Sequence, residues 1–142
     1  RWGRTYEGFS SSAPLVARLG AAAVRGLQQH QRHDRAHIAA CAKHFAADGA
    51  TANGTNEGEA HLSAEQLVEH LRPYVEAVDA GVLSVMVSYS SINGQKCHAN
   101  THLVTNFLKG HLGFKGLVVS DWGGADQLEG GAVTRFATAI EA

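Results

Sequence analysis

The sequence is poor in the features that define several common protein classes. Its 142 residues include only two cysteines, Cys41 and Cys97, which are too few for a disulfide framework. No apolar run approaches the roughly 20 residues that a membrane-spanning helix needs. The sequence also has no excess of one charge, because its 12 Lys and Arg residues nearly balance its 13 Asp and Glu residues and give a formal net charge of −1. We therefore expect neither a membrane nor a nucleic acid as a partner.

Metal-binding and phosphate-binding motifs are missing as well. The nine histidines are scattered, and no pair of them is backed by carboxylates at the spacing of metal ligands. The segment "DWGG" (121–124) lacks the Gly-x-Gly pattern that opens a phosphate-binding helix. The sequence thus predicts no metal site and no cofactor. Cys41 lies in an apolar run and is expected to pack as a small hydrophobe, so the redox compartment is left open.

The residues that are present fit a globular domain. Hydrophobic residues make up 44% of the chain, and its length suits one domain. The chain begins "RWGRTYEG", without Met or a signal-peptide pattern, and it ends in a helix-like pattern without a stop signal. We expect residues 1–142 to be a piece of a longer protein, whose targeting signal, if it has one, lies outside them.

Apolar periodicity predicts alternating helices and strands. Strands are predicted at 37–45, 82–90 and 116–122. Because each of these runs is apolar along its length, we expect strands that are covered on both faces. Helices are predicted at 14–28, 63–80 and 101–112, and from about residue 131 onward. This alternation favours parallel strands that are joined by crossover helices.

The helix predicted at 63–80 carries the clearest end signals. Ser63 and Gln66 have the spacing of a capping box, and Gly81 is typical of a C-terminal stop. Pro73 lies inside the helix and is expected to kink or break it, because proline has no N–H to donate and its ring crowds the preceding turn.

Polar side chains follow each predicted strand at the point where the strand ends. The first strand ends in Lys43 and His44, the second in Ser88, Tyr89 and Ser90, and the third in Ser120, Asp121 and Trp122. The carboxyl ends of parallel strands meet at one edge of a sheet, and functional groups of α/β folds gather there. Ionisable groups at all three ends are hard to explain by stability alone.

Each of these side chains also has a purely structural interpretation. Asp121 could cap a helix, Lys43 and His44 could be a solvated strand end, and Tyr89 and Trp122 could pack in the core. Taken together, however, the groups suit one chemistry. A carboxylate among cations stays ionised and can act as a nucleophile. Cationic side chains donate hydrogen bonds to hydroxyls, and an indole stacks on a sugar ring, so the combination indicates carbohydrate chemistry.

Six motifs give the chain a resemblance to a known enzyme family. They are "RWGRTYE" (1–7), "ACAKHFAADGAT" (40–51), "VMVSYSSING" (85–94), "CHAN" (97–100), "LVTNFLK" (103–109) and "GFKGLVVSDWGG" (113–124). Their order and spacing are similar to those of the family 3 glycoside hydrolases, in particular the β-glucosidase and exo-β-glucanase branch. The resemblance implies an α/β fold, a partial (β/α)8 TIM-like barrel. Residues 1–142 would supply about three β/α units of the N-terminal catalytic domain, and the α/β sandwich domain that follows in the family is absent from this chain.

The resemblance also implies roles for individual residues. Asp121, in "SDW", matches the catalytic nucleophile. Residues expected to bind the substrate are Arg4, Lys43, His44, Tyr89, Trp122 and Glu57. Among these, Arg4, Lys43 and His44 would donate hydrogen bonds to the sugar. Tyr89 would lie beneath the reacting sugar, Trp122 would form an aromatic wall, and Glu57 would be an auxiliary acid.

The implied activity is that of a retaining, exo-acting β-glycosidase that removes terminal β-D-glucosyl residues from β-glucosides or β-glucans. Such a mechanism needs two carboxyl groups. Only Asp121 is visible, since the acid/base of this branch is a Glu of the following sandwich domain. The expected partners are an oligosaccharide or β-glucoside and the second domain of the same protein. The resemblance implies a periplasmic or secreted location, which the chain itself does not report.

Three alternatives remain open. The β-N-acetylhexosaminidase branch of the same family has Pro-Gly after "KHF" and a downstream Asp-Ser-His, whereas this chain has Ala46 and Ala47 and no such triplet. A sugar-binding relative without turnover would share most of the motifs. Lys43 could instead form a Schiff base, as in barrel aldolases, although this would leave Asp121 and Trp122 unexplained.

A complete barrel of this type takes roughly 250 residues. A segment with three strands would leave two strand edges unpaired and apolar surface in contact with water. We therefore expect the 142-residue chain on its own to be unstable or aggregated, and inactive.

Overall fold

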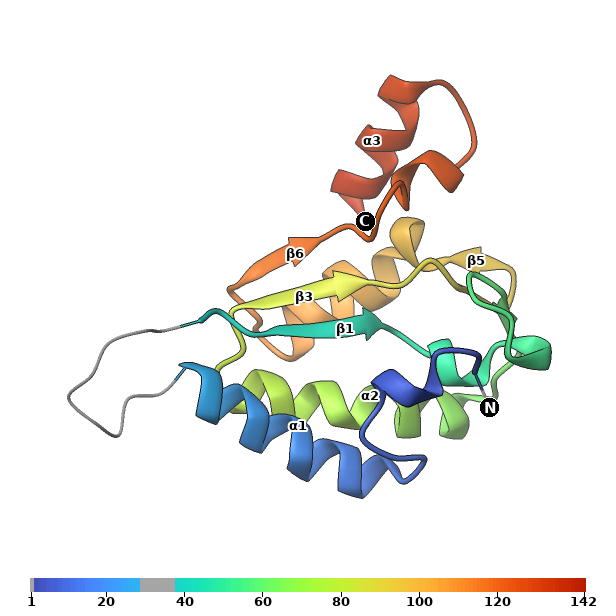
Figure 1. Ribbon diagram of the computed structural model, residues 1–142. Helices are drawn as coiled ribbons and strands as arrows, with labels where there is room; N and C mark the ends of the chain where they lie inside the picture. Colours follow the sequence, from blue (N-terminus) through green and yellow to red (C-terminus); the bar gives the residue numbers. More distant parts are fainter. Residues whose placement is uncertain (1, 29–37) are drawn as a thin grey trace.

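The three predicted strands form one parallel sheet. The computed structural model describes residues 2–28 and 38–142. Its main sheet has the order β1-β3-β6, with strands β1 (Cys41–Phe45), β3 (Ser84–Val87) and β6 (Leu117–Val119). Both pairs of neighbouring strands are parallel, so the strands point the same way and follow the order of the chain (Figure 1). Each strand is shorter than predicted, and residue 37 lies outside the described residues.

Helices connect the strands as the sequence predicts. They are α1 (Ala13–Gln28), α2 (Ala64–Asp79), η5 (His102–His111) and α3 (Ala132–Glu141). The third of them has wide π-type turns, as in the hydrogen bond from Leu112 N–H to Phe107 O. Figure 1 shows α1 and α2 side by side along one face of the sheet, and α3 beyond the end of β6. Within the described ranges, no helix has the length and apolar character needed to cross a membrane.

The end signals of α2 are confirmed, and Pro73 does not break the helix. Ser63 Oγ accepts the backbone N–H of Gln66, and the Gln66 side chain accepts the backbone N–H of Ser63. Gly81 adopts a left-handed φ of +84° just after the helix. The helix nevertheless continues through Pro73 to Asp79. Its packing against α1 and β1 outweighs the cost of about 3 kcal/mol that an internal proline carries.

The core lies between the sheet and the helices. Phe45, Val85, Cys97 and Leu108 are all fully inaccessible to solvent, and they come from two strands, a short helical turn and η5. The ring of Phe45 meets that of Tyr74 edge-on, with centroids 4.9 Å apart. This packing fixes β1 and β3 beside each other and so sets the spacing of the side chains that follow them.

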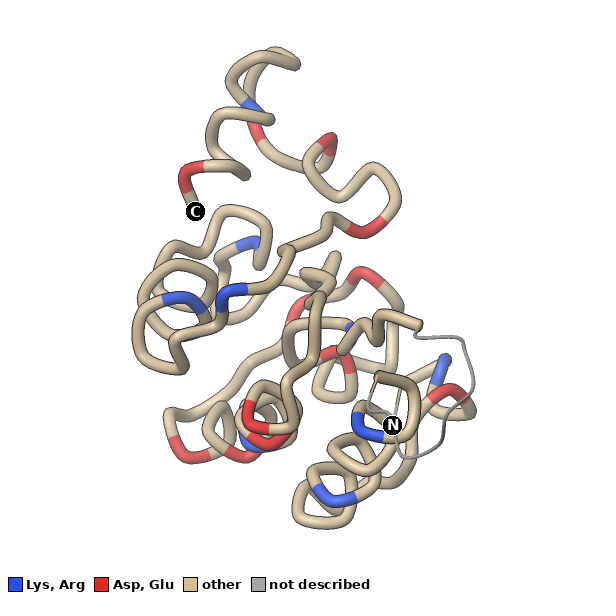
Figure 2. The backbone as a smooth tube through the Cα atoms, turned by 90° about the vertical axis from the view of Figure 1, so that its left-hand side faces the viewer, with Lys and Arg blue, Asp and Glu red and all other residues tan. Residues whose placement is uncertain are grey.

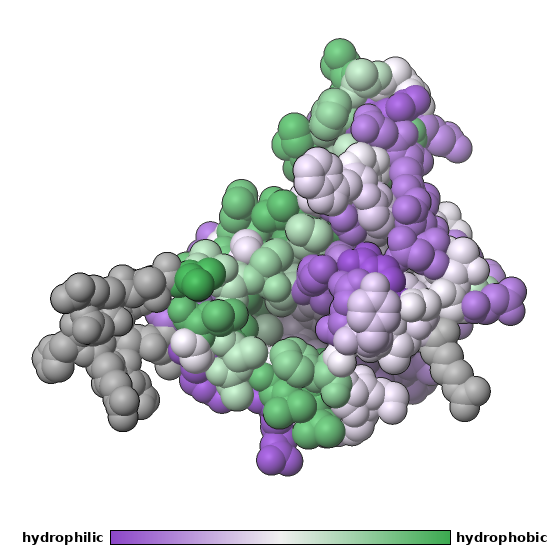
Figure 3. All heavy atoms as spheres, in the orientation of Figure 1, coloured by the Kyte–Doolittle hydropathy of each residue, from purple (hydrophilic) through white to green (hydrophobic). Residues whose placement is uncertain are grey.

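The described residues 2–28 and 38–142 leave one face of the sheet uncovered, which corrects the prediction of strands buried on both faces. Leu117, at the start of β6, is 67% exposed, and Cys41 is exposed and does not pack in the core. Figure 3 shows hydrophobic residues gathered over the end of the sheet where the strands begin. The reason is topological, because the strands of a barrel enclose a shared interior and three strands leave that interior open.

Short elements that the sequence did not predict lie near the carboxyl ends of the strands. A second sheet has the order β2-β4-β5, with strands β2 (Glu59–Ala60), β4 (Ser91–Ile92) and β5 (Gln95–Lys96). Single turns of 3₁₀ helix are η1 (Thr5–Glu7), η2 (Asp48–Ala50), η3 (Ala52–Gly54), η4 (Cys97–Ala99) and η6 (Ala125–Gln127). Figure 2 shows basic and acidic residues interspersed along the described backbone, in keeping with the small net charge.

The burial of Cys97 leads to a first testable prediction. Burial raises the pKa of the Cys97 thiol to about 11, so that almost none of it is the reactive thiolate at pH 8. In the native protein, we expect iodoacetamide at pH 8 to leave Cys97 unmodified and to modify it after unfolding. Peptide mass spectrometry would quantify the labelling at each cysteine, with Cys41, which is exposed, as the internal comparison. Rapid labelling of native Cys97 would contradict the packing described above.

Candidate active site

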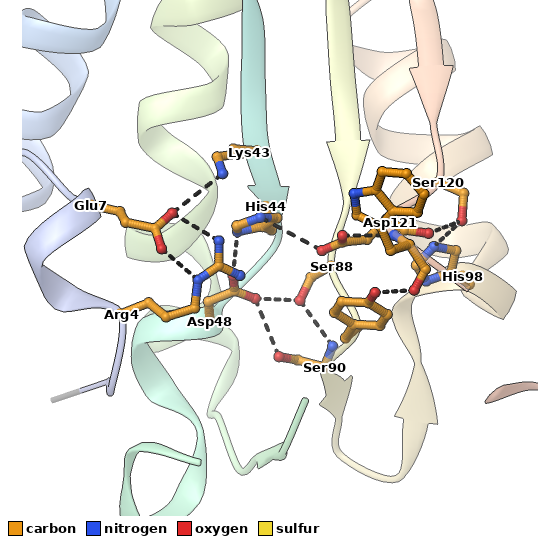
Figure 4. Close-up of polar contacts among 12 residues, drawn as sticks. Arg4, Glu7, Lys43, His44, Asp48, Ser88, Ser90, His98, Ser120 and Asp121 are labelled. Atoms are coloured by element: carbon orange, nitrogen blue, oxygen red, sulfur yellow. Dashed lines mark hydrogen bonds and ion pairs between the residues drawn. The ribbon is translucent and has the colours of Figure 1, made fainter. Parts of the chain in front are cut away.

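The side chains at the ends of the three parallel strands lie together. Figure 4 shows Lys43 and His44 from β1, Ser88 after β3 and Asp121 after β6 around one region, with Arg4 approaching from the N-terminal segment. These positions agree with the predicted meeting of strand ends. Two carboxylates, Glu7 and Asp48, lie among them as well, and sequence reasoning had assigned neither a role.

Asp121 is held by one carboxylate oxygen, and the other accepts no hydrogen bond from the described residues. The side chain follows β6 in a residue that is only 7% exposed. Its Oδ1 accepts the backbone N–H of Trp122 at 2.8 Å. Its Oδ2 is buried and has no hydrogen-bond partner among the residues that the structure describes, and His44 Nε2 lies 3.6 Å away. A buried, unpaired carboxylate oxygen is costly, so its presence indicates a role other than stability.

His44 is fixed from its other side by Asp48. The His44 Nδ1 atom lies 2.8 Å from Asp48 Oδ2, and both side chains are largely buried. Asp48 Oδ1 accepts hydrogen bonds from the hydroxyls of Ser88 and Ser90, so this carboxylate ties the end of β1 to the end of β3. The signal that could have revealed Asp48 is its position four residues after His44 in "KHFAAD".

Glu7 pairs with two cationic side chains, those of Arg4 and Lys43. Its carboxylate forms a two-pronged ion pair with Arg4, with Nε–Oε1 and Nη2–Oε2 distances of 2.6 and 2.8 Å. The ammonium group of Lys43 lies 3.3 Å from the same Oε2. The hydrogen bonds from Arg4, followed by that from Lys43, lower the pKa of Glu7 to about 2. Glu7 thus stays ionised, and it sets Arg4 and Lys43 side by side.

Tyr89 and Trp122 border the aspartate. The Tyr89 hydroxyl donates to the backbone carbonyl of Trp122, which joins the ends of β3 and β6. Burial and then the negative charge of Asp121 raise the pKa of the Tyr89 phenol, so it remains a neutral donor at physiological pH. The Trp122 ring is 91% exposed, which shows that the alternative interpretation of Trp122 as a core residue is wrong for this chain.

Glu57 is connected to this region less directly. Its Oε2 accepts a hydrogen bond of 2.7 Å from the side chain of Gln127, whose own oxygen accepts one from Lys96. The charge of Glu57 is a smaller contribution to the raised pKa of Tyr89. The structure therefore places Glu57 near the tyrosine but shows it bonded to Gln127, not to Asp121.

A cavity of about 510 Å³ lies beside Asp121. It is bordered by Met86 of β3, by Trp122 and by Phe136 of α3 as well as by the aspartate. A space of this size accepts a small molecule, and it combines an apolar lining with one carboxylate. In residues 2–28 and 38–142, no group of three or more His, Cys, Asp or Glu side chains is arranged to hold a metal ion.

Parallel strands in chain order, joined by helices and carrying polar groups at their carboxyl ends, are typical of (β/α) barrel proteins. The particular family follows from comparison with known proteins. Residues 1–142 match the Glycosyl hydrolase family 3 N terminal domain, and the chain belongs to that family. The predicted family and the predicted fold class, three β/α units of a TIM-like barrel, are thereby confirmed.

Named relatives support the same assignment. A β-xylosidase of Formosa agariphila is 39% identical over 133 residues, which cover 91% of this chain and 18% of that protein. A periplasmic β-glucosidase of Salmonella typhimurium is 35% identical over 129 residues, covering 90% of the chain and 17% of the relative. The chain thus spans less than a fifth of the length of these curated relatives.

Solved structures agree in fold. A mutant of the exo-1,3/1,4-β-glucanase from a Pseudoalteromonas species superimposes with a TM-score of 0.89 at 38% identity, over 98% of this chain and 23% of that one. A β-glucosidase from Listeria innocua superimposes with a TM-score of 0.86 at 28% identity, over 99% of this chain and 21% of that one.

Proposed function

We propose that this chain forms the nucleophile-bearing segment of a retaining, exo-acting β-glycosidase, with Asp121 as the nucleophile. The observation that carries the proposal is the state of its carboxylate. One oxygen is fixed by the backbone of Trp122, and the other is buried, unpaired within the described part of the chain, and 3.6 Å from His44. In the reaction, Asp121 Oδ2 bonds to the anomeric carbon as the glycosidic C–O bond breaks, and water later releases the sugar.

The neighbouring side chains suit the recognition of a sugar. Arg4 and Lys43 offer charged donors to vicinal hydroxyls, and such charge-assisted hydrogen bonds are roughly twice as strong as neutral ones. The ring of His44 lies between them and Asp121 and offers a further polar group. The exposed indole of Trp122 offers an apolar face for a pyranose ring. The neutral phenol of Tyr89 lies beside Asp121, and its hydrogen bond to the Trp122 carbonyl holds the ring next to the proposed reacting centre.

The second carboxyl group of the mechanism would come from a part of the enzyme that this chain does not contain. A retaining glycosidase needs an acid/base that protonates the leaving oxygen, with the two carboxyl groups about 5–5.5 Å apart. We propose that it is a Glu of a following α/β sandwich domain in a longer polypeptide. The 142-residue chain alone would then be inactive.

The proposed substrates are terminal β-D-glucosyl residues of β-glucosides or β-glucans. Glucanases and β-glucosidases among the relatives support this class, and the β-xylosidase adds xylosides as the competing one. The test is to assay the full-length enzyme on aryl β-glucoside and β-xyloside and to follow the first-formed anomer by NMR. Release of the β-anomer supports the proposal, whereas an initial α-anomer, or no turnover of either substrate, would contradict it.

A second prediction concerns Glu7. The variant Glu7→Gln loses one negative charge and most of the ion pairing that aligns Arg4 and Lys43. Because these cations bind the sugar in both ground and transition states, we expect KM to rise about tenfold with little change in kcat. Steady-state kinetics on an aryl β-glucoside would measure both. The control is Glu69→Gln, a change in an exposed glutamate on α2, and an unaltered KM in Glu7→Gln would refute the alignment role.

A further inference from the structure

We propose that His98 is a positioning residue that holds the end of β6, and with it the carboxylate of Asp121, against the end of β3. The inference rests on the proposed role of Asp121 as the nucleophile. His98 lies in η4, and its contact with β6 is made to the residue before the aspartate. Its action would therefore be indirect, through the backbone that carries the aspartate.

The contact between His98 and β6 runs through Ser120. The Nε2 atom of His98 lies 3.0 Å from Ser120 Oγ. The Ser120 hydroxyl in turn donates to the backbone carbonyl of Asp121 at 2.7 Å. The tautomer of the ring sets which atom donates in the His98–Ser120 contact, and this contact links the ring to the residue before Asp121. Figure 4 shows His98 and Ser120 beside Asp121.

The ring also packs against the turn that follows the nucleophile. A Cβ atom added to Gly124 would lie 2.3 Å from both Cε1 and Nε2 of His98, closer than any real contact. Glycine at this position thus lets the backbone of the turn approach the imidazole face. The backbone of the "DWGG" segment therefore packs directly against the ring of His98.

The other end of the ring faces β3. A hydrogen bond with the backbone of Ser88 contributes to the titration of His98, but burial outweighs it and lowers the pKa of the ring, which keeps the imidazole neutral. Only 5% of His98 is exposed. One rigid, buried side chain thus spans the end of β3, the residue before the nucleophile and the turn after it.

A histidine that merely fills the core would not need this arrangement. Its removal would lower stability, and the rate of each folded molecule would be unchanged. A positioning residue instead changes the rate at which a folded site attacks, because a displacement of about 1 Å can cost on the order of 100-fold. The two roles can therefore be separated by measurements on the folded fraction alone.

The test compares two amides in the full-length enzyme. His98→Gln places an amide group near the position of Nε2, whereas His98→Asn reaches only the position of Nδ1. Glycosylation by a 2-deoxy-2-fluoro β-glucoside is followed by mass spectrometry, and the rate is taken from the population that becomes labelled. We expect His98→Asn to be slower by about 30-fold and His98→Gln to stay within about threefold of the parent. The control His102→Gln, an exposed histidine bonded only to Asn106 among the contacts described, should be unaffected.

A third variant, Ser120→Ala, keeps the test decisive if a His98 variant does not fold. Ser120 is exposed, so we expect its substitution to leave the fold intact. It should slow glycosylation to the same degree as His98→Asn, and the double variant should be no slower than either single one. Any of three results would overturn the proposal. The Gln and Asn variants could have equal rates, the effects in the double variant could be additive, or the Ser120→Ala enzyme could keep the parent's rate. A label on a residue other than Asp121 would instead refute the proposed function, which keeps the two failures apart.

Discussion

Replacing Asp121 by Asn in the full-length enzyme is expected to lower kcat by at least about a thousandfold, because loss of a covalent nucleophile removes the glycosyl-enzyme pathway. The amide keeps the shape of the side chain and can still accept the Trp122 N–H through its oxygen. The fold should therefore persist. Steady-state assays on an aryl β-glucoside, together with circular dichroism, would show a folded and inactive enzyme.

The matched control for this change is Asp126→Asn. Asp126 is an exposed carboxylate that borders the same cavity, five residues after the aspartate. Its replacement makes the same change of charge in the same region, and we expect kcat to stay within about twofold of the parent, because this exposed carboxylate is not the group that attacks the sugar. Comparable losses in the two variants would mean that local charge, not a nucleophile at position 121, determines the rate.

Replacing Asp48 by Ala is expected to lower the free energy of unfolding by about 3 kcal/mol, because it leaves several buried hydrogen-bond donors without an acceptor. The Nδ1 atom of His44 and the hydroxyls of Ser88 and Ser90 all use this carboxylate. Both serines are only 1% exposed, so water does not readily replace the lost acceptor. Urea denaturation of the full-length enzyme would measure the change.

Turnover should fall as well in Asp48→Ala, because His44 loses the partner that orients its ring towards Asp121. We expect a loss of about tenfold or more in kcat/KM for the folded enzyme. Ser63→Ala is a suitable comparison, since it removes a helix-cap acceptor far along the chain and should cost only about 1 kcal/mol without changing turnover. An Asp48→Ala enzyme with the parent's stability would contradict the three contacts described for this carboxylate.

The main elements of the fold could be predicted because they carry periodic signals. The capping box at Ser63 and the left-handed Gly81 gave the bounds of α2 to within a residue. Strands of two residues, such as those at Glu59–Ala60 and Gln95–Lys96, contain no period to detect. The open face of β6 was missed for another reason, since the burial of a strand depends on what covers it and not only on its own residues.

The site was partly predictable for a related reason. Strand ends converge by topology, so Lys43, His44 and Asp121 could be brought together from the chain order. Asp48, four residues after His44, gave a local signal, but several other side chains that hold the site have partners that are distant in sequence. Glu7 contacts a lysine 36 residues away, and His98 contacts a serine 22 residues away. A local pattern gives no information on such pairs.

The environment of Lys43 bears on the Schiff-base alternative. A lysine that forms a Schiff base is activated by a desolvated pocket or by a neighbouring cation that favours the neutral amine. The side chain of Lys43 is 43% exposed and lies 3.3 Å from the carboxylate of Glu7, so it is not in a desolvated pocket. This geometry suits a cation that binds hydroxyl groups, and it weighs against an aldolase-like role.

The central claim is that the free oxygen of Asp121 attacks the anomeric carbon. The most direct test is to inactivate the full-length enzyme with a 2-deoxy-2-fluoro β-glucoside, digest it, and locate the attached sugar by tandem mass spectrometry. We predict one labelled peptide, with the fluoroglucosyl group on Asp121. A sugar attached to any other residue, or inactivation without a covalent adduct, would contradict the claim.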